Sequence, residues 1–411
     1  MVRELKHTEI GDIPVDWELQ TFDETFRVIS NNTLSRENLN NRGGAVRNIH
    51  YGDILTKFPE VLDCNEEEIP YVNELSLLSS STQLLQDGDI VVADTAEDET
   101  VGKVIEVQNL GDSKLVAGLH TIPCRVKKGE FAPGWLGYYM NSDLFHNQIL
   151  PYITGIKVSS ISKGAISETL ILVPPFDEQE KIVQSLNKIQ LLMTTETKVV
   201  NKIKLVKNGC LSKMFPQKDD TVPEMRLPGF NEAWEQRKLK DVVDFLDTMR
   251  KPLEGAKRIP GPYPYYGASG IVDYVDGYLF DEELVLLSED GANITDRNYP
   301  VCFLASGKYW VNNHAHVLRT KDGNENNFIC NSLERKDYKQ YNSGMAMPKL
   351  NKGVCQSIPI SCPRFDEQKK IGDYFRNLDH LITLHQCKCD KYSNIKKGMM
   401  SDLLTGKIRL V

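Results

Sequence analysis

The sequence lacks any long apolar segment. No stretch of its 411 residues approaches the roughly 18 consecutive apolar residues of a membrane helix. The acidic residues Glu4, Glu9 and Asp12 near the start also differ from the basic and apolar pattern of a signal peptide. We therefore expect a cytoplasmic protein with no membrane-bound part.

The sequence also lacks the cysteine and histidine patterns of disulfide frameworks and metal sites. Its nine cysteines are odd in number and scattered, which favours reduced thiols. The closest pair, Cys387 and Cys389, has no second pair of cysteine or histidine to complete a zinc site. His314 and His316 alternate along an expected strand and so share one face, but no third ligand is visible. We predict no metal in this chain.

Catalytic motifs are missing as well. The sequence contains no Gly-x4-Gly-Lys-Ser/Thr loop for nucleotide phosphates. The stretch VPPF resembles the end of the Asn-Pro-Pro-Phe/Tyr box of amino-methyltransferases, but Val173 stands in place of the asparagine and no glycine-rich cofactor loop precedes it. The Glu-x-Lys triplet that begins at Glu334 matches a nuclease motif, but such a triplet occurs by chance in most proteins. We predict a non-catalytic chain that binds no cofactor.

The distribution of charge limits where nucleic acid could bind. The chain carries 49 Lys and Arg against 57 Asp and Glu, a net charge of −8. Residues 1–175 hold 14 basic against 26 acidic residues (−12), and residues 219–364 hold 18 against 21 (−3). Residues 176–218 (+4) and 365–411 (+3) are basic. A DNA-binding surface must therefore be a local patch on an otherwise acidic protein.

What the sequence does contain is an internal repeat, which indicates a duplicated architecture. The phrases PPFDEQEKI and PRFDEQKKI place Asp177 and Asp366 at positions that differ by 189. This offset holds without a gap between residues 154–218 and residues 343–407. Each half therefore ends in the same kind of tail.

The repeated tail is predicted to form a long helix in each half. The Phe-Asp-Glu-Gln box supplies a start, because Asp and Glu favour the positive N-terminal end of a helix. Beyond the box, apolar positions alternate at spacings of four and three for more than four turns, which is typical of a coiled-coil seam. The predicted seam residues are Ile182, Leu186, Ile189, Met193, Val200, Ile203, Ile371, Phe375, Leu378, Ile382, Tyr392 and Met399.

The two predicted helices carry matching seams. Polar residues interrupt them at the same positions, for example at Glu196 and at its equivalent His385. Helices of about 33 residues would be roughly 50 Å long, and two with matching seams pack most simply on each other. We predict an antiparallel pair within one chain, with Val200 opposite His385 and Glu196 opposite Cys389.

The rest of each half is a variable body that follows a Trp-Glu box, at Trp17 and Trp234. Short runs rich in β-branched residues predict strands at 88–95, 120–126, 283–290 and 314–320. We predict an α/β (α+β) fold with two similar domains, a pair of long antiparallel coiled-coil helices that separates them, and an internal pseudo-twofold duplication. The predicted divisions are 1–175 for the first domain, 176–218 for the first long helix, 219–364 for the second domain, and 365–411 for the second long helix with the tail.

Together these features resemble the specificity subunit of type I restriction–modification enzymes. The resemblance covers the whole chain and rests on the two variable bodies, the FDEQ helices, the Trp-Glu boxes, the YPYYGASGIVDY turn and the C-terminal KKGMMSDLLTGKIRL. It implies two target-recognition domains held apart by an antiparallel pair of helices. Each domain would read one half of a split, asymmetric site in double-stranded DNA.

The same resemblance implies partners. The helices would dock two DNA adenine-methyltransferase subunits, and two restriction and translocase subunits would join those. S-adenosylmethionine, ATP and Mg would be bound by the partner subunits and not by this chain. A coiled-coil scaffold that does not bind DNA and a self-sufficient DNA-modifying enzyme remain as alternatives. The target bases, the spacer length and the presence of restriction subunits stay open.

Base edges are read by amide, guanidinium and hydroxyl groups, so residues of these kinds are the candidates for DNA contact. In the first body they are Asn31, Asn32, Arg36, Asn41, Arg42, Arg47, Asn48, His50, Lys157, Ser159, Ser160 and Lys163. In the second body they are Arg250, Lys251, Tyr263, Tyr265, Tyr266, Ser269, Asn293, Arg297, Asn312, Asn313, His314 and Lys349. The loops GIKVSSISKG and GMAMPKLNKG are favoured, because the duplication places both at equivalent sites.

Overall fold

The computed structural model of the chain describes residues 4–155, 157–217 and 220–410. It contains two compact units, the first comprising Met1–Thr195 with Cys389–Val411 and the second comprising Glu196–Lys388. The predicted boundary between residues 218 and 219 lies outside the described residues.

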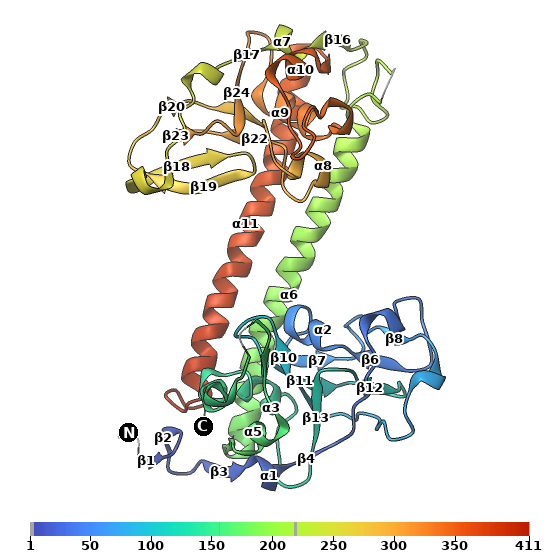
Figure 1. The fold of residues 1–411 in the computed structure, drawn as a ribbon, viewed down its shortest axis with the longest axis vertical. Coiled ribbons are helices and arrows are strands. Elements are labelled where there is room, and N and C mark those ends of the chain that lie inside the picture. The colour runs from blue at the N-terminus through green and yellow to red at the C-terminus, as the bar shows by residue number, and fades with distance from the viewer. Residues whose placement is uncertain (1–3, 156, 218–219, 411) are drawn as a thin grey trace. The chain divides into compact units, whose positions relative to one another are not determined.

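The first unit is built on a five-stranded sheet with the strand order β4-β13-β9-β11-β7 (Figure 1). Its neighbouring strands are antiparallel, except that β11 and β7 are parallel. Every residue of β9 is buried, which explains why this strand is apolar throughout and does not alternate. The strands are β4 (Phe26–Val28), β7 (Val61–Asp63), β9 (Ile90–Ala93), β11 (Val104–Gln108) and β13 (Thr121–Val126).

The second unit repeats four of these strands in the same order. Its central sheet has the order β17-β24-β21-β22 and is antiparallel throughout. The strands are β17 (Val243–Phe245), β21 (Leu284–Ser288), β22 (Cys302–Ala305) and β24 (Ala315–Thr320). The four strands predicted from the sequence are confirmed as β9, β13, β21 and β24.

Each unit adds a second four-stranded sheet, and here the two halves diverge. The order is β12-β6-β8-β5 in the first unit and β19-β18-β23-β20 in the second. The first of these sheets consists of β5 (Leu39–Asn40), β6 (Arg47–Ile49), β8 (Tyr71–Val72) and β12 (Leu115–Ala117). The other consists of β18 (Pro260–Gly267), β19 (Gly270–Val275), β20 (Phe280–Asp281) and β23 (Lys308–Val311). A common frame therefore carries two different inserts.

In both units the Trp-Glu box forms a strand that pairs with the strand leading into a long helix. In the first unit β3 (Glu18–Thr21) is antiparallel to β15 (Leu170–Val173). In the second unit β16 (Glu235–Lys238) is antiparallel to β25 (Pro359–Cys362). The long helices α6 and α11 follow directly and begin at the phenylalanine of each FDEQ box, with Asp and Glu in the first turn. They span Phe176–Lys213 and Phe365–Leu403.

The remaining elements are short. The helices are α1 (Phe22–Thr25), α2 (Tyr51–Thr56), α3 (Trp135–Tyr139), α4 (Asp143–Ile149), α5 (Lys163–Ser167), α7 (Leu239–Val242), α8 (Asn293–Asp296), α9 (Asn326–Glu334) and α10 (Lys352–Ser357). The remaining strands are β1 (Leu5–Thr8), β2 (Gly11–Pro14), β10 (Thr95–Ala96) and β14 (Ser159–Ser160). Within the described ranges, no helix has the length and apolar character that crossing a membrane requires.

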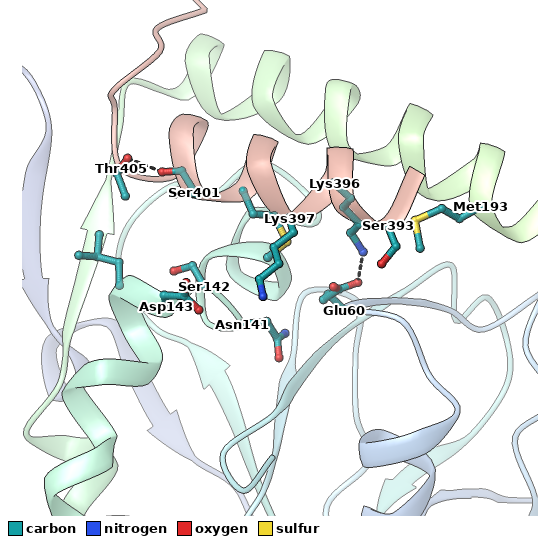
Figure 2. A pocket seen from close by; sticks show the side chains of 12 residues that line it. Glu60, Asn141, Ser142, Asp143, Met193, Ser393, Lys396, Lys397, Ser401 and Thr405 are labelled. Atoms are coloured by element: carbon teal, nitrogen blue, oxygen red, sulfur yellow. Dashed lines mark hydrogen bonds and ion pairs between the residues drawn. The ribbon is translucent and has the colours of Figure 1, made fainter. Parts of the chain in front are cut away.

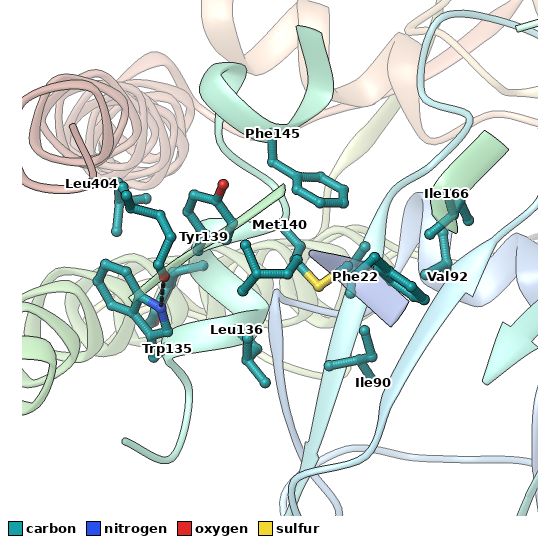
Figure 3. Close-up of a cluster of buried hydrophobic side chains, with 14 of the residues drawn as sticks. Phe22, Ile90, Val92, Trp135, Leu136, Tyr139, Met140, Phe145, Ile166 and Leu404 are labelled. Carbon is teal, nitrogen blue, oxygen red and sulfur yellow. Dashed lines mark hydrogen bonds between the residues drawn. The ribbon is translucent and has the colours of Figure 1, made fainter. Parts of the chain in front are cut away.

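Aromatic side chains of α3 fill the core of the first unit (Figure 3). The rings of Trp135 and Tyr139 stack with centroids 6.0 Å apart, and both are fully buried. The Trp135 indole donates to the carbonyl of Leu172 in β15 at 3.2 Å. Leu404, which directly follows α11, packs into the same cluster. Burial of each such side chain stabilises the fold by about 1.5–3 kcal/mol.

The end of α6 has the same role in the second unit. Phe215, just beyond α6, stacks on Phe328 of α9 with centroids 5.3 Å apart and lies edge-on to Trp234 at 6.0 Å. Each long helix therefore starts in one unit and ends in the core of the other.

The two helices run antiparallel where they pair within a unit. In the second unit Lys207 Nζ lies 2.5 Å from Asp379 Oδ1. Closer to the end of α6, Cys210 Sγ lies 3.3 Å from the hydroxyl of Tyr374. Residue numbers therefore rise along α6 as they fall along α11, as predicted.

At one point of the seam, two residues that are equivalent in the repeat bind each other. The carboxylate of Glu196 binds Nδ1 of His385, and Lys388 Nζ lies 3.5 Å from the same carboxylate. Glu196 and His385 differ by 189 positions, the repeat offset, so they are equivalent residues of the two copies. The predicted register agrees with the other contacts along the pair, since Lys207 with Asp379 and Cys210 with Tyr374 each fall within one residue of it. Glu196 bonds His385, which lies one turn from its predicted partner Cys389.

The glutamate of each FDEQ box is buried and bound by an arginine that follows the other long helix. In the first unit Glu178 is 1% exposed and accepts two hydrogen bonds of 2.7 Å from Arg409. It also accepts a bond of 2.9 Å from the Trp17 indole. In the second unit Glu367 is 2% exposed and accepts two bonds of 2.7 Å from Arg226. We call these two ion pairs the helix-start latches.

Removal of either latch arginine should destabilise the chain. Arg409→Ala and Arg226→Ala should each lower the free energy of unfolding by about 3–5 kcal/mol, because each leaves a buried carboxylate without its cation. Urea unfolding of the purified variants measures this. The control is Arg364→Ala, whose pair with Glu232 is exposed on both sides (79% and 61%) and should contribute less than about 1 kcal/mol. Equal effects of all three substitutions would contradict the latch assignment.

Exchange of Glu196 and His385 should be tolerated, whereas single substitution should not. His385→Glu places two carboxylates together and should lower the midpoint of thermal unfolding at pH 7, and adding Glu196→His should restore it. The hydrogen bond to His385 lowers the pKa of Glu196 below its usual 4.5. The stabilisation by the pair is therefore full above about pH 4.5 and is lost as the pH falls through the lowered pKa. A double variant no more stable than the single one would show that the two residues are not coupled.

Candidate nucleic-acid interface

A short hairpin stands before each long-helix joint, in the two loops that the duplication makes equivalent. In the first unit the backbones of Thr154 and Ser160 exchange hydrogen bonds of 3.0 and 2.8 Å. In the second unit the N–H of Ser343 donates to the carbonyl of Lys349 at 2.9 Å. The closing residues differ by 189 positions, so both halves build the same hairpin.

Both hairpins turn at a glycine because no other residue fits. A Cβ at Gly155 would lie 1.9 Å from the carbonyl oxygen of Val158, and one at Gly344 would lie 1.8 Å from that of Met347. In the second hairpin the side chain of Asn342 accepts bonds of 2.9 Å from the N–H groups of Gly344 and Lys349. The close contacts of the glycine and the hydrogen bonds to backbone N–H groups thus fix the conformation of the turn, and the side chains at its tip are not needed for this.

The tips of the hairpins project into solvent and differ between the halves. Met345 and Met347 in the second unit are 99% and 60% exposed, and Val158 in the first is 49% exposed. Lys157 beside Val158 is also exposed. Each unit thus presents a rigid hairpin with its own side chains at the tip.

Each hairpin is anchored to the end of a central strand. The N–H of Ile161 donates to the carbonyl of Asp94, just beyond β9, at 2.9 Å. At the equivalent place the N–H of Leu350 donates to the carbonyl of Glu289, just beyond β21, at 2.7 Å. The hairpins therefore lie at corresponding edges of the two central sheets.

A histidine paired with a carboxylate lies beside each hairpin. His314 Nδ1 is 2.8 Å from Oδ1 of Asp290, and Asp290 forms a β-bridge to Lys349. His120 Nδ1 is 3.5 Å from Oδ1 of Asp94. The side chains of His314 and His120 are 50% and 44% exposed. Both directly precede equivalent strands, β24 and β13.

Seven of the predicted second-body residues gather around the hairpin of that unit. Asn312 Oδ1 accepts the N–H of His314 at 2.8 Å, and Arg250 donates to the carbonyl of Asn313 at 3.3 Å. Asn293 donates to the carbonyl of Ala268 at 3.4 Å, which brings in the adjacent β18–β19 turn. The seven are Arg250, Ser269, Asn293, Asn312, Asn313, His314 and Lys349.

The other predicted second-body residues lie elsewhere or are engaged within the body. Arg297 binds Glu334 at the end of α9 at 2.8 Å. Tyr263 packs on Tyr278 with centroids 5.2 Å apart. Tyr265 is 1% exposed. Tyr266, whose pKa is raised by burial, and Lys251 lie beside β23.

In the first unit six predicted residues lie near the hairpin and its histidine. Asn31 donates to the carbonyls of Gly118 and Thr121 at 3.1 and 3.0 Å, on either side of His120. The Tyr51 ring lies edge-on to His120 at 5.3 Å and stacks on His50. The six are Asn31, Asn32, Asn48, His50, Ser159 and Ser160. Lys157 at the hairpin tip and Lys163 at the start of α5 are exposed.

Three predicted residues of the first body lie on other surfaces of that body. Asn41 and Arg42 are exposed beyond β5, and the Asn40 side chain accepts the N–H of Arg42 at 2.8 Å. Arg36 is held by Asp53 at 2.7 Å.

Several predicted DNA contacts are buried and have to be corrected to internal roles. Asn32 and Asn48 hydrogen-bond each other at 2.7 Å, and Arg47 donates to the carbonyl of Cys64 at 2.6 Å. Burial and the nearby Arg36 lower the pKa of His50. The side chains of these residues are largely covered and are bonded within the body. The buried residues are Asn32, Arg47, Asn48, His50, Tyr265, Asn293 and Asn312.

His316, the neighbour of His314 along β24, is buried and internally bonded. Its Nδ1 lies 2.9 Å from Asp247, and its Nε2 lies 2.8 Å from the carbonyl of Leu350 at the base of the hairpin. Burial by itself would lower the pKa of His316, but the hydrogen bonds to Asp247 and Cys355 outweigh it and raise the pKa to about 10. Across the described residues no group of three or more potential ligands could hold a metal ion.

A cavity of about 330 Å³ lies where α11 ends beside the first body (Figure 2). Lys396 is buried there and binds Glu60 at 2.6 Å and Gln190 at 2.8 Å. Lys397 points from the same helix toward Asn141. Since Glu60 neutralises Lys396, this cavity is a joint between helix and body, and we do not count it with the interface.

Five residues of the latches and of the histidine sites were not predicted from the sequence: His120, Asp94, Asp290, Arg226 and Arg409. His120 and Asp94 were detectable, because HTIPCRV and HAHVLRT place His120 and His314 at the same point before equivalent strands. The latch arginines have a weaker signal, the short echo KIRL and EMRL that contains Arg409 and Arg226. No sequence pattern indicates Asp290, because its contact with His314 depends on where the hairpin lies in the folded chain.

The comparisons with known proteins agree with this architecture. The family described as "Type I restriction modification DNA specificity domain" matches this chain twice, over residues 14–205 and 231–391. A Haemophilus influenzae protein named as a type I restriction enzyme specificity subunit is 36% identical over 151 residues, which cover 37% of this chain and 38% of that protein. The MjaX specificity subunit of Methanocaldococcus jannaschii is 26% identical over 424 residues, covering 98% of this chain and 96% of that protein.

Solved structures share the fold. The S subunit of a type I restriction–modification system from M. genitalium superposes with a TM-score of 0.63 at 15% identity, covering 98% of this chain and 99% of that one. A chain from a study of complex assembly in the type I system gives 0.53 at 15% identity, covering 96% and 99%. The predicted fold class is confirmed, with two similar mixed domains and two long helices. This chain belongs to the family of type I restriction–modification specificity subunits.

Proposed function

We propose that this chain reads a bipartite, asymmetric site in double-stranded DNA, one half with each unit. The observation that carries this is a common frame that presents two different readers. The central sheets, the hairpins and the helix joints correspond, whereas the second sheets and the hairpin tips differ. Base contacts specify sequence and the frame positions them, so two different readers on one frame suit two different half-sites.

We further propose that α6 and α11 dock two DNA adenine-methyltransferase subunits. Both helices keep large apolar side chains in solvent, although their seams are covered. Two of these positions recur in both halves at the repeat offset, Leu192 with Leu381 and Val206 with Ile395, and are 39–45% exposed. Exposed apolar groups on an otherwise polar helix favour a protein partner. Two equivalent surfaces favour two copies.

In this proposal the chain is the non-catalytic reader of its complex. S-adenosylmethionine, ATP and Mg would be bound by methyltransferase and restriction subunits. The two alternatives differ in measurable ways. A self-sufficient enzyme would transfer labelled methyl groups to DNA without partners, and a scaffold would not shift DNA even with the methyltransferase subunit present.

Exchange of one body should change one half of the recognised site. Replacement of residues 240–342 by the corresponding body of a relative leaves the long helices, the hairpin of residues 343–349 and the first unit intact, so only the half-site read by the second unit should change. Sequencing of methylated adenines in cells that carry the chain and its methyltransferase measures both halves at once. The unmodified chain is the control. If both halves changed, or if neither did, the assignment of one reader to each half-site would be wrong.

A charged residue introduced into one docking surface should prevent one of the two methyltransferase subunits from binding. Val206→Glu and Ile395→Glu each place a carboxylate in one of the two equivalent surfaces, so each should reduce the complex from two methyltransferase subunits to one. The double variant should bind none. Native mass spectrometry of the complex gives the stoichiometry. Asn394→Glu, at an exposed polar position beside Ile395, is the matched control and should keep both subunits. Loss of both subunits from either single variant would contradict two separate docking surfaces.

A further inference from the structure

The duplication offers a comparison within one chain between features that the two units share and features that differ. If the units read different half-sites, as proposed above, residues retained at the same place in both cannot specify the bases that differ. Retained residues that contact DNA must instead meet what all half-sites have in common, which is the sugar–phosphate backbone. The tips fit the other role, since Ala346 and Met347 stand in one unit where Lys157 and Val158 stand in the other.

The histidines beside the hairpins are retained in this sense. The carbonyl of His120 accepts the N–H of Asp94 at 3.1 Å, and the carbonyl of His314 accepts the N–H of Glu289 at 2.8 Å. The same Asp94 and Glu289 anchor the two hairpins. His120 and His314 thus occupy one structural position in two bodies whose second sheets have diverged.

A carboxylate lies on the Nδ1 side of both histidines, in direct contact with His314 and through the Thr95 hydroxyl, which donates to Asp94 at 2.8 Å, at His120. His120 Nδ1 faces Asp94 at 3.5 Å and the Thr95 hydroxyl at 3.3 Å, and His314 Nδ1 faces Asp290 at 2.8 Å. The carboxylate is Asp94 in the first unit. In the second unit it is Asp290, which directly follows Glu289, the equivalent of Asp94. Within the described ranges Nε2 of neither histidine has a partner, so this nitrogen is the one left for a ligand.

The backbone conformation at His120 favours a function for this residue beyond stabilising the fold. Its φ is +57°, a left-handed conformation that is uncommon for residues other than glycine. Residues held in such conformations cluster at functional sites. An asparagine or glycine would adopt the turn at lower cost, yet the position carries an imidazole.

A protonated imidazole between two anions donates from both ring nitrogens. Nδ1–H donates to Asp290 at His314 and to the Thr95 hydroxyl at His120, which fixes each ring, and Nε2–H is then directed at a phosphate oxygen, a charge-assisted hydrogen bond. The groups that face the rings suit this: Asp94 and Tyr51 on His120, and Asp290 on His314. Residues 1–175 carry −12, so a phosphate needs a local hydrogen-bond donor at the point where it approaches this body.

We propose that His120 and His314 are phosphate-binding residues, one for each half of the DNA site, each oriented by its carboxylate partner. This rests on the proposed function, because it presumes that each hairpin meets DNA. It adds a sequence-independent contact at a position shared by both units, distinct from the base-reading tips.

The test uses the complex of the full chain with its methyltransferase subunits and a duplex that carries the methylated site. His120→Ala and His314→Ala should each weaken binding about fivefold, the effect of about 1 kcal/mol. Each should also reduce the slope of log affinity against log salt by about 0.9, the value for one phosphate contact. The methylated sequence should stay the same in both variants.

The matched control is His7→Ala. His7 is also an exposed histidine with its Nδ1 2.8 Å from an aspartate, Asp12, but it lies in the β1–β2 hairpin and has no counterpart in the second unit. Its removal should change neither the affinity nor the salt slope. His120→Arg and His314→Arg separate a charge contact from a structural role, because arginine restores a cation but not the shape of the ring.

Recovery of affinity and slope by the arginine variants would support the proposal. An unchanged salt slope in the alanine variants, an altered methylated sequence, or a loss that arginine does not recover would each overturn it. A failure of the proposed function is recognisable separately, because the unmodified complex would then show no methylation at a defined bipartite sequence.

Discussion

The buried glutamate at the start of each long helix is the constraint on which the rest of the structure depends. A carboxylate that is 1–2% exposed is costly unless a cation meets it, and here the cation is far away in sequence. Glu178 and Arg409 are separated by 231 positions, and Glu367 and Arg226 by 141. Each helix start is therefore complete only when the other long helix has ended beside it. This makes the two copies of the repeat depend on each other.

The pairing of Glu196 with His385 also makes the two copies of the repeat depend on each other, at the middle of the helix pair. In a seam made only of apolar residues, neighbouring registers differ little in energy, and a polar pair at one position favours a single register. Because the two residues are copies of each other in the repeat, two identical helices would bring glutamate to glutamate or histidine to histidine at this point. The divergence of one repeated position thus favours pairing of the two different copies.

A frame defined in this way allows the bodies to vary. The central sheets, the glycine-based hairpins and the anchored histidines correspond between the units, whereas the second sheets have different strand orders and different connections. Charge follows the same division: residues 176–218 and 365–411 are basic, and the bodies are acidic. Few cations remain near the hairpins, and many of those, such as Arg250 with Glu289, are already paired. Affinity for DNA would therefore depend largely on partner subunits, and this chain would supply mainly register and specificity.

The sequence by itself determined the elements that local pattern encodes. The alternation of four and three gave α6 and α11 their extent, the FDEQ boxes placed their first residues, and the runs of β-branched residues located β9, β13, β21 and β24. Only the tertiary structure decided which polar residues face solvent. Asn32, Asn48 and Arg47 look like base readers in the sequence, but they are buried because residues distant in sequence cover them and accept their hydrogen bonds. The partners of Glu178 and of His120 likewise depend on chain segments brought together by folding, which no local periodicity records.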